Sequence, residues 1–136
     1  MADFPKMLHT VLDTTDVRGL AEFYREFLGL QYRPGDSPPT EGPDDTDWLV
    51  LVEAGGARRL AFQLVERLEP TTWPEHDVPM QLHVDYTVPD VAELERHRDR
   101  AIELGARLVL DRSDNADEPL YVLADPAGHP FCIFVA

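Results

Sequence analysis

The sequence predicts an α+β protein in which two βαβββ modules form a curved mixed sheet around a shared cup. Three observations predict this fold. Residues 8–17 (LHTVLDTTDV) and 82–91 (LHVDYTVPDV) repeat one phrase, with Leu-His at the start and Asp-Val at the end. Each phrase leads into a helical pattern that ends in Leu-Gly. Three short apolar segments, separated by turn-rich stretches, follow each helix, so the chain contains two copies of one module.

Module one spans residues 7–66 and opens with a strand expected at 8–13. The apolar residues of the next segment recur at i, i+3, i+4, i+7 and i+8, which predicts one buried face of a helix. Asp16 can cap the start of this helix, and Gly29 can supply its left-handed exit. Three further strands are expected at 30–33, 47–53 and 59–66.

Module two spans residues 81–136 and repeats this order, with a first strand expected at 82–88. Asp90 and Glu93 form a capping-box-like pair at the start of its helix, and Gly105 closes the helix. The apolar stripe of this helix is weaker than that of the first. It consists of Val91, Leu94, Ala101 and Ile102. Three further strands are expected at 106–110, 119–124 and 130–135.

Length and composition bound the classes of protein that remain. The 136 residues favour a single domain, 1–136, with the proline-rich segment 67–80 as the linker between the modules. The formal net charge of −14 argues against a nucleic-acid partner, because phosphates would be repelled. No apolar run suits a membrane helix, and the N-terminus lacks a secretion signal. With a single cysteine, the chain is expected to be cytoplasmic.

Strand side chains alternate between two faces, so parity decides which residues share a surface. In each module one set is apolar and should pack under the helix, whereas the other set is mixed and should face the cup. The residues expected on the cup side include His9, Gln63, His83, Asp85, Cys132 and Phe134. Because His9 and His83 occupy equivalent positions, we expect them to face each other across the cup.

The chain resembles the vicinal oxygen chelate superfamily, which includes glyoxalase I, bleomycin-resistance proteins and extradiol dioxygenases. The resemblance rests on the paired modules, the His at the head of each first strand and the Asp seven residues after each His. The strings WPEHDVPMQLHVDY and DPAGHPFCIF are most similar to its glyoxalase-like domain branch. The resemblance implies a glyoxalase-like fold, a homodimer and a metal site at four positions. These positions fall on His9, Gln63, His83 and Cys132.

Two of these four positions depart from the superfamily, in which many metal-dependent members carry glutamate on the last strands. Gln63 offers only a neutral carbonyl oxygen and cannot act as a base near neutral pH. Cys132 can bind a metal as a thiolate, which favours zinc over iron or manganese, or it can be a small core residue. Asp85 can replace a missing carboxylate or orient an imidazole. The two histidines either hold a divalent metal such as zinc or only line a pocket.

Aromatic residues can supply flat apolar walls for a ligand in the cup. Trp48, Tyr121 and Phe134 are candidates by parity and position in the module, although Trp48 can equally pack locally in its hairpin. The loop 34–46 is either a flap over the cup or a plain surface loop. The expected ligand pocket comprises His9, Trp48, Gln63, His83, Asp85, Tyr121, Cys132 and Phe134.

Three functional hypotheses follow. The first is a protein that binds a small organic molecule in its cup. The second is a metal-dependent lyase, isomerase or epimerase of the glyoxalase type, with Asp85 or His129 as the only nearby candidate bases. The loss of both last-strand carboxylates makes a dioxygenase unfavourable. The third is a non-catalytic interaction module, for which the sequence offers no specific signal.

Overall fold

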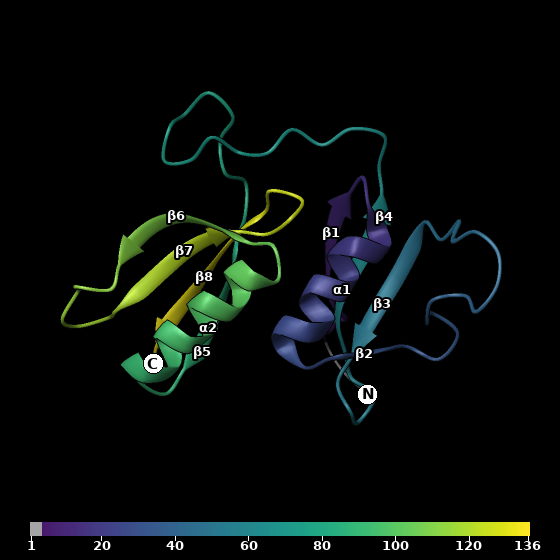
Figure 1. Ribbon diagram of the computed structural model, residues 1–136, viewed down its shortest axis with the longest axis horizontal. Helices are drawn as coiled ribbons and strands as arrows, with labels where there is room; N and C mark the ends of the chain where they lie inside the picture. Colours follow the sequence, from purple (N-terminus) through teal and green to yellow (C-terminus); the bar gives the residue numbers. More distant parts are fainter. Residues whose placement is uncertain (1–3) are drawn as a thin grey trace. The chain divides into compact units, whose positions relative to one another are not determined.

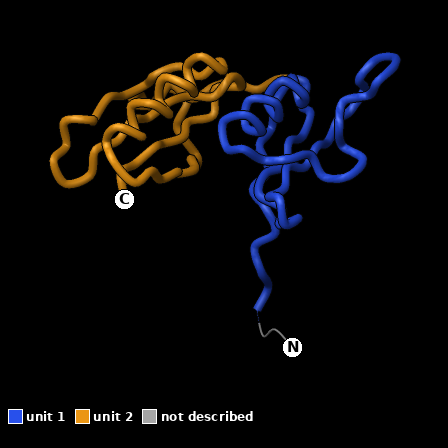
Figure 2. The backbone as a smooth tube through the Cα atoms, turned by 60° about the horizontal axis from the view of Figure 1, so that its bottom comes forward, with its two compact units in different colours: residues 1–66 blue, residues 67–136 orange. Residues whose placement is uncertain are grey.

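The computed structural model describes residues 4–136 and divides the chain into two compact units. Unit 1 ends at Glu66 and unit 2 begins at Arg67, so the expected linker belongs to unit 2 (Figure 2). Each unit contains one four-stranded sheet and one helix that lies against one face of that sheet (Figure 1). The expected α+β architecture of two βαβββ modules is therefore confirmed. No helix among the described residues is long and apolar enough to cross a membrane.

Unit 1 forms a mixed sheet with the strand order β1-β4-β3-β2. Strands β1 and β4 pair in parallel, whereas β4 with β3 and β3 with β2 pair antiparallel. Parallel pairing of the first and last strands is possible because α1 and two other strands lie between them in the chain. The elements are β1 (Thr10–Thr14), α1 (Val17–Leu28), β2 (Gln31–Tyr32), β3 (Trp48–Val52) and β4 (Arg58–Leu64).

Helix α1 begins and ends where the sequence indicates. The Asp16 carboxylate accepts a hydrogen bond from the Gly19 N–H at 3.0 Å, which satisfies one of the free N–H groups of the first turn. Gly29 ends the helix with a φ of 68°, a backbone conformation that costs glycine little. The buried face of α1 packs on the sheet, where the Tyr24 and Phe62 rings stack at 5.9 Å.

Unit 2 repeats this topology with the order β5-β8-β7-β6 and parallel pairing of β5 with β8. Both first strands begin two residues later than expected, so His9 and His83 precede their strands by one residue instead of lying within them. The elements are β5 (Val84–Val88), α2 (Val91–Glu103), β6 (Arg107–Arg112), β7 (Leu120–Ala124) and β8 (Pro130–Val135).

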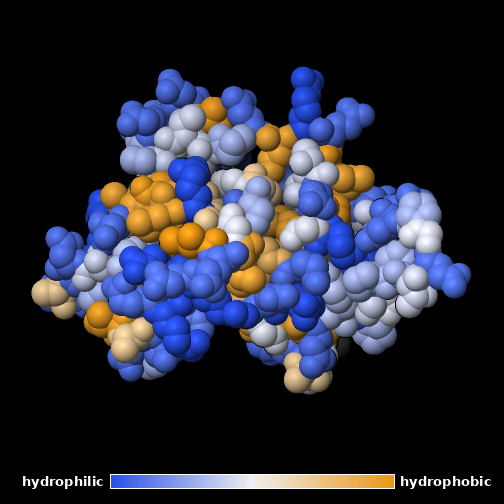
Figure 3. Space-filling model, in the orientation of Figure 1, coloured by the Kyte–Doolittle hydropathy of each residue, from blue (hydrophilic) through white to orange (hydrophobic). Residues whose placement is uncertain are grey.

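Helix α2 is capped as expected but packs by a narrower stripe. Asp90 accepts from the Glu93 N–H at 2.8 Å, whereas the Glu93 carboxylate accepts from Arg96 and does not complete a capping box. Only Leu94 and Ala101 of the expected stripe are buried, and both Val91 and Ile102 are exposed. The outer surface over α2 is mainly hydrophilic (Figure 3).

The acidic loop 34–46 is fastened to α1 by Arg18. The Arg18 guanidinium donates to the Asp44 carboxylate at 2.7 Å and to the Asp36 carbonyl at 2.6 Å, and it lies over the Tyr32 ring at 4.9 Å. The hydrogen bond from Arg18 lowers the pKa of Asp44 to about 2, so Asp44 stays ionised and able to accept from Arg18 at every physiological pH. These contacts attach the loop to the helix of unit 1, which disfavours a flap over the opposite face of the sheet.

We predict that Asp16→Ala lowers the free energy of unfolding by about 1 kcal/mol, because the first turn of α1 loses its side-chain acceptor. Urea denaturation followed by circular dichroism measures the change. Asp16→Asn is the matched control, since asparagine caps equally well and should leave stability near that of the wild type. Equal stability of the Ala and Asn variants would contradict this role for Asp16.

Candidate functional site

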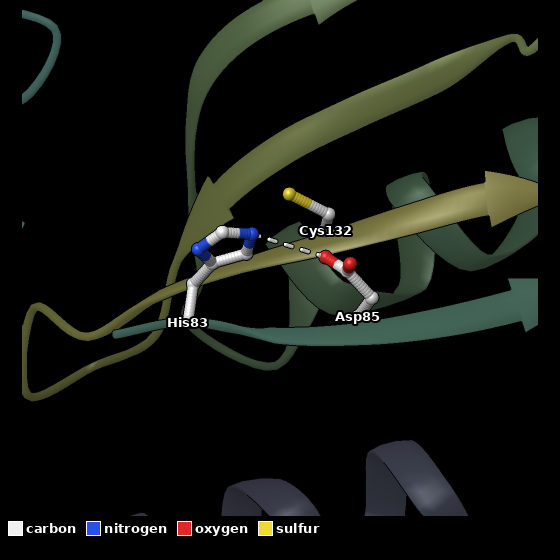
Figure 4. A group of neighbouring side chains, drawn as sticks. All are labelled: His83, Asp85 and Cys132. Atoms are coloured by element: carbon white, nitrogen blue, oxygen red, sulfur yellow. Dashed lines mark ion pairs between the residues drawn. The ribbon is translucent and has the colours of Figure 1, made fainter. Parts of the chain in front are cut away.

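The helix-free face of unit 2 brings together three side chains that can bind a metal. Asp85 on β5 is the direct neighbour of Cys132 on β8, and His83 lies two residues before Asp85 on the same side. The Nε2 atom of His83 is 3.3 Å from Oδ1 of Asp85. One ligand atom from each residue lies within 4.8 Å of the others (Figure 4). The structure therefore assembles His83, Asp85 and Cys132, as parity predicts.

The environment of this group is asymmetric. The Cys132 side chain is buried, whereas the side chains of His83 and Asp85 are 40% and 55% exposed. Burial, together with the charge of Asp85 and a hydrogen bond to its carboxylate, raises the pKa of the Cys132 thiol to about 12. At neutral pH Cys132 is thus a buried thiol that donates to Asp85. The side chains of Asp85 and His83 lie beside it and are exposed to solvent.

Phe134 shares this face, two residues beyond Cys132 on β8. It pairs with Thr87 of β5, and it is half-buried. Val122 of β7 pairs with Cys132 from the other side. An apolar border therefore adjoins the polar group, as a small-molecule surface requires.

The helix-free face of unit 1 is mainly apolar. The rings of His9 and Trp48 lie 5.9 Å apart, and Trp48 packs against a buried cluster of Val50, Val52 and Ala61. Partial burial, and then the nearby charges of Arg58 and Arg33, lower the pKa of His9. Its Nδ1 atom is buried without a hydrogen-bond partner among the described residues. His9 is therefore a neutral imidazole beside an aromatic wall, and its pairing with His83 across one cup stays a prediction.

The strand register shows that Gln63 is not the counterpart of Cys132. Val11 pairs with Ala61 in unit 1 in the same way that Asp85 pairs with Cys132 in unit 2. Gln63 instead pairs with Asp13, which is four residues, or about 13 Å of strand, beyond His9. The register therefore does not support Gln63 as the counterpart of Cys132, and its role as a metal ligand stays a prediction. The matching position holds Ala61, whose side chain has no donor atom.

Tyr121 lies on the opposite face from the one expected. It pairs with Ile133, and its hydroxyl group donates to Glu95 at 2.7 Å and accepts from Arg98 at 3.0 Å. Glu95 and Arg98 belong to α2, so Tyr121 fastens the helix to the sheet and does not line a cup. Its assignment to the ligand pocket is wrong because the register of β7 with β8, which fixes the face, cannot be read from the sequence.

His129 occupies the tight turn between β7 and β8. The sequence reasoning overlooked Asp125, whose buried carboxylate accepts from the N–H groups of Ala127 and His129 at 2.9 and 3.0 Å. These bonds build the turn that leads Pro130 and Cys132 into β8. The aspartate at the head of the DPAGH string was the available signal, because aspartate commonly accepts from nearby backbone N–H groups in turns.

Paired βαβββ modules of this topology are the fold of the vicinal oxygen chelate class of proteins. Residues 9–134 match the family described as "Glyoxalase-like domain", and the chain belongs to this family. The predicted family resemblance is thereby confirmed. A search of curated proteins found no match.

Solved structures show the same fold at low sequence identity. A glyoxalase/bleomycin resistance/dioxygenase family enzyme from Burkholderia phytofirmans PsJN is similar with a TM-score of 0.67 and 16% identity, over 93% of this chain and 95% of that chain. Fosfomycin resistance protein FosX from Listeria monocytogenes gives 0.69 and 13%, over 98% and 92%. FosX from Mesorhizobium loti gives 0.67 and 15%, over 100% and 94%.

We predict that metal-free protein reacts with iodoacetamide at pH 8 roughly 100-fold or more slowly than an unfolded peptide thiol does, because only the thiolate is nucleophilic and Cys132 is buried. The rate should rise with pH above 9 towards 12, as the thiol ionises. Mass spectrometry of the single cysteine gives the rate.

Asp85→Asn is the control for this prediction, since removal of the adjacent charge lowers the pKa of Cys132 and should speed the reaction. A wild-type rate that equals that of the unfolded thiol would contradict the described environment.

Proposed function

We propose that this glyoxalase-like domain binds a small organic molecule against its helix-free sheet faces. The observation that carries the proposal is the character of the unit 1 face, where the His9–Trp48 ring pair lies over an apolar cluster and Ala61 replaces a ligand. On unit 2, Phe134 adjoins the polar group of His83, Asp85 and Cys132. Aromatic walls with a few polar groups are the usual lining of a small-molecule site.

The chemistry of these residues supports binding more than glyoxalase catalysis. A glyoxalase-type reaction needs a carboxylate base beside the metal to move a proton next to a carbonyl. Ala61 supplies no such group in unit 1, and in unit 2 the carboxylate beside His83 and Cys132 is Asp85, which is close enough to bind the metal itself. Similar structures include proteins named for resistance to fosfomycin, so antibiotics are sensible first probes of the proposed ligand. The proposed partner is this ligand, and the expected homodimer and cytoplasmic location stay predictions.

The two tryptophans of the chain allow a sharp test of this proposal. In Trp73→Phe the only remaining indole is that of Trp48, on the proposed surface, whereas in Trp48→Phe it is that of Trp73, in the segment 67–80. We predict that an organic molecule found by thermal shift changes the fluorescence of Trp73→Phe and leaves that of Trp48→Phe unchanged. The screen uses metal-free protein with bleomycin, fosfomycin and a panel of aromatic metabolites.

Two results would count against ligand binding at these faces. One is a screen in which none of these probes raises the melting temperature. The other is a ligand that changes only the Trp73 signal, since binding would then lie at the linker. His76→Ala, in the same linker, is a matched control for His9→Ala and should retain the affinity that His9→Ala loses.

The second candidate is a metal-dependent lyase, isomerase or epimerase that uses a divalent cation such as zinc. It is favoured by the close approach of His83, Asp85 and Cys132. When bound, zinc would polarise the vicinal oxygens of a substrate. An Asp85 that binds the metal cannot also serve as the free base. His129 is the other base candidate, and its backbone belongs to the β7–β8 turn.

Proton exchange distinguishes the two candidates. The binding proposal predicts that zinc-loaded protein does not exchange the proton next to the carbonyl of small α-hydroxy ketones in D2O, because Asp85, the carboxylate at the site, would be bound to the metal. NMR measures this exchange. Exchange above the buffer rate that is lost in His83→Ala and in His129→Ala would establish the enzyme instead.

A further inference from the structure

We propose that His83, Asp85 and Cys132 form a zinc-class metal site that is complete within the second module and takes no ligand from the first. This inference goes beyond ligand binding, because the site holds its metal whether or not an organic molecule binds. It also differs from the four-position set that the resemblance implies. The carboxylate comes from the first strand of the module, and neither His9 nor Gln63 takes part.

The backbone already places the three donors correctly. Asp85 and Cys132 are direct partners in the parallel pairing of β5 and β8, and His83 projects to the same side from the residue before β5. Around tetrahedral zinc, with bonds of roughly 2.0–2.3 Å, neighbouring ligand atoms are about 3.5 Å apart. The His83 Nε2 and Asp85 Oδ1 atoms are 3.3 Å apart, and all three ligand atoms lie within 4.8 Å. Small side-chain rotations therefore suffice to close the site.

The donor set selects the kind of metal. One sulfur, one imidazole nitrogen and one carboxylate oxygen suit zinc and disfavour magnesium or calcium, which prefer oxygen alone. The exposed side chains of His83 and Asp85 leave a fourth position open to water or to a ligand. On binding, the S–H bond of Cys132 breaks, its proton passes to solvent and a metal–sulfur bond forms, with no change in oxidation state.

Module one provides an internal control for this site. Its equivalent positions hold His9, Val11 and Ala61, of which only His9 carries a donor atom. The imidazole of His9 instead lies beside Trp48 and the positive charges of Arg33 and Arg58, which oppose a cation. A site confined to module two is therefore insensitive to loss of His9, whereas a site shared between the modules needs both histidines.

Cobalt titration of the full chain, purified without a tag and freed of metal, tests the inference. Because Cys132 is the single cysteine, thiolate-to-cobalt charge-transfer absorption in the near ultraviolet reports this residue alone. We expect one equivalent of Co²⁺ to bind with this absorption and zinc to displace it. His83→Ala and Cys132→Ser should weaken binding by at least about 100-fold, and Asp85→Asn by roughly 10- to 100-fold. His9→Ala should stay within about twofold of the wild type.

Three outcomes would overturn the inference: no cobalt binding, cobalt binding without thiolate absorption, or equal weakening by His9→Ala and His83→Ala. The wild-type spectrum needs no variant, so it decides the role of Cys132 even where Cys132→Ser fails to fold. Circular dichroism checks that the His9→Ala and His83→Ala variants are folded. The organic-ligand screen uses metal-free protein, so failure of either proposal is seen separately.

Discussion

Parallel pairing of the first and last strands within each module is the interaction on which the rest of the structure depends. It sets Asp85 beside Cys132 in unit 2 and Val11 beside Ala61 in unit 1. Because side chains alternate along a strand, a slip of one residue between β5 and β8 would put Asp85 and Cys132 on opposite faces of the sheet. The pairing therefore fixes both the core and the surface on which chemistry is possible.

The same pairing carries different chemistry in the two modules. In unit 2 it assembles a buried thiol, a carboxylate and an exposed imidazole. In unit 1 the same positions are apolar, and the remaining histidine lies against Trp48. The two copies thus share one hydrogen-bonded frame, while one carries the side chains of the proposed metal site and the other offers an aromatic surface.

Much of this organisation could be predicted from local sequence signals. The repeated phrases, the cap at Asp16 and the exit at Gly29 each depend on neighbouring residues, so they can be read without knowledge of the fold. The alternation of side chains likewise identified the faces of His83 and Cys132. Alternation could not decide between Ala61 and Gln63 as the counterpart of Cys132, because both lie on one face. Only the register between β1 and β4 does so, and this register joins two strands that are far apart in the sequence.

The prediction that Tyr121 lines the cup was wrong for a related reason, since the face of Tyr121 follows from its pairing with Ile133.

The central claim of the account is that the second module alone holds the proposed metal-binding group. Anomalous scattering at the zinc edge, from crystals grown with zinc, tests it most directly. The account predicts a peak about 2.0–2.3 Å from donor atoms of His83, Asp85 and Cys132. A peak liganded by both His9 and His83, or none beside Cys132, would contradict it.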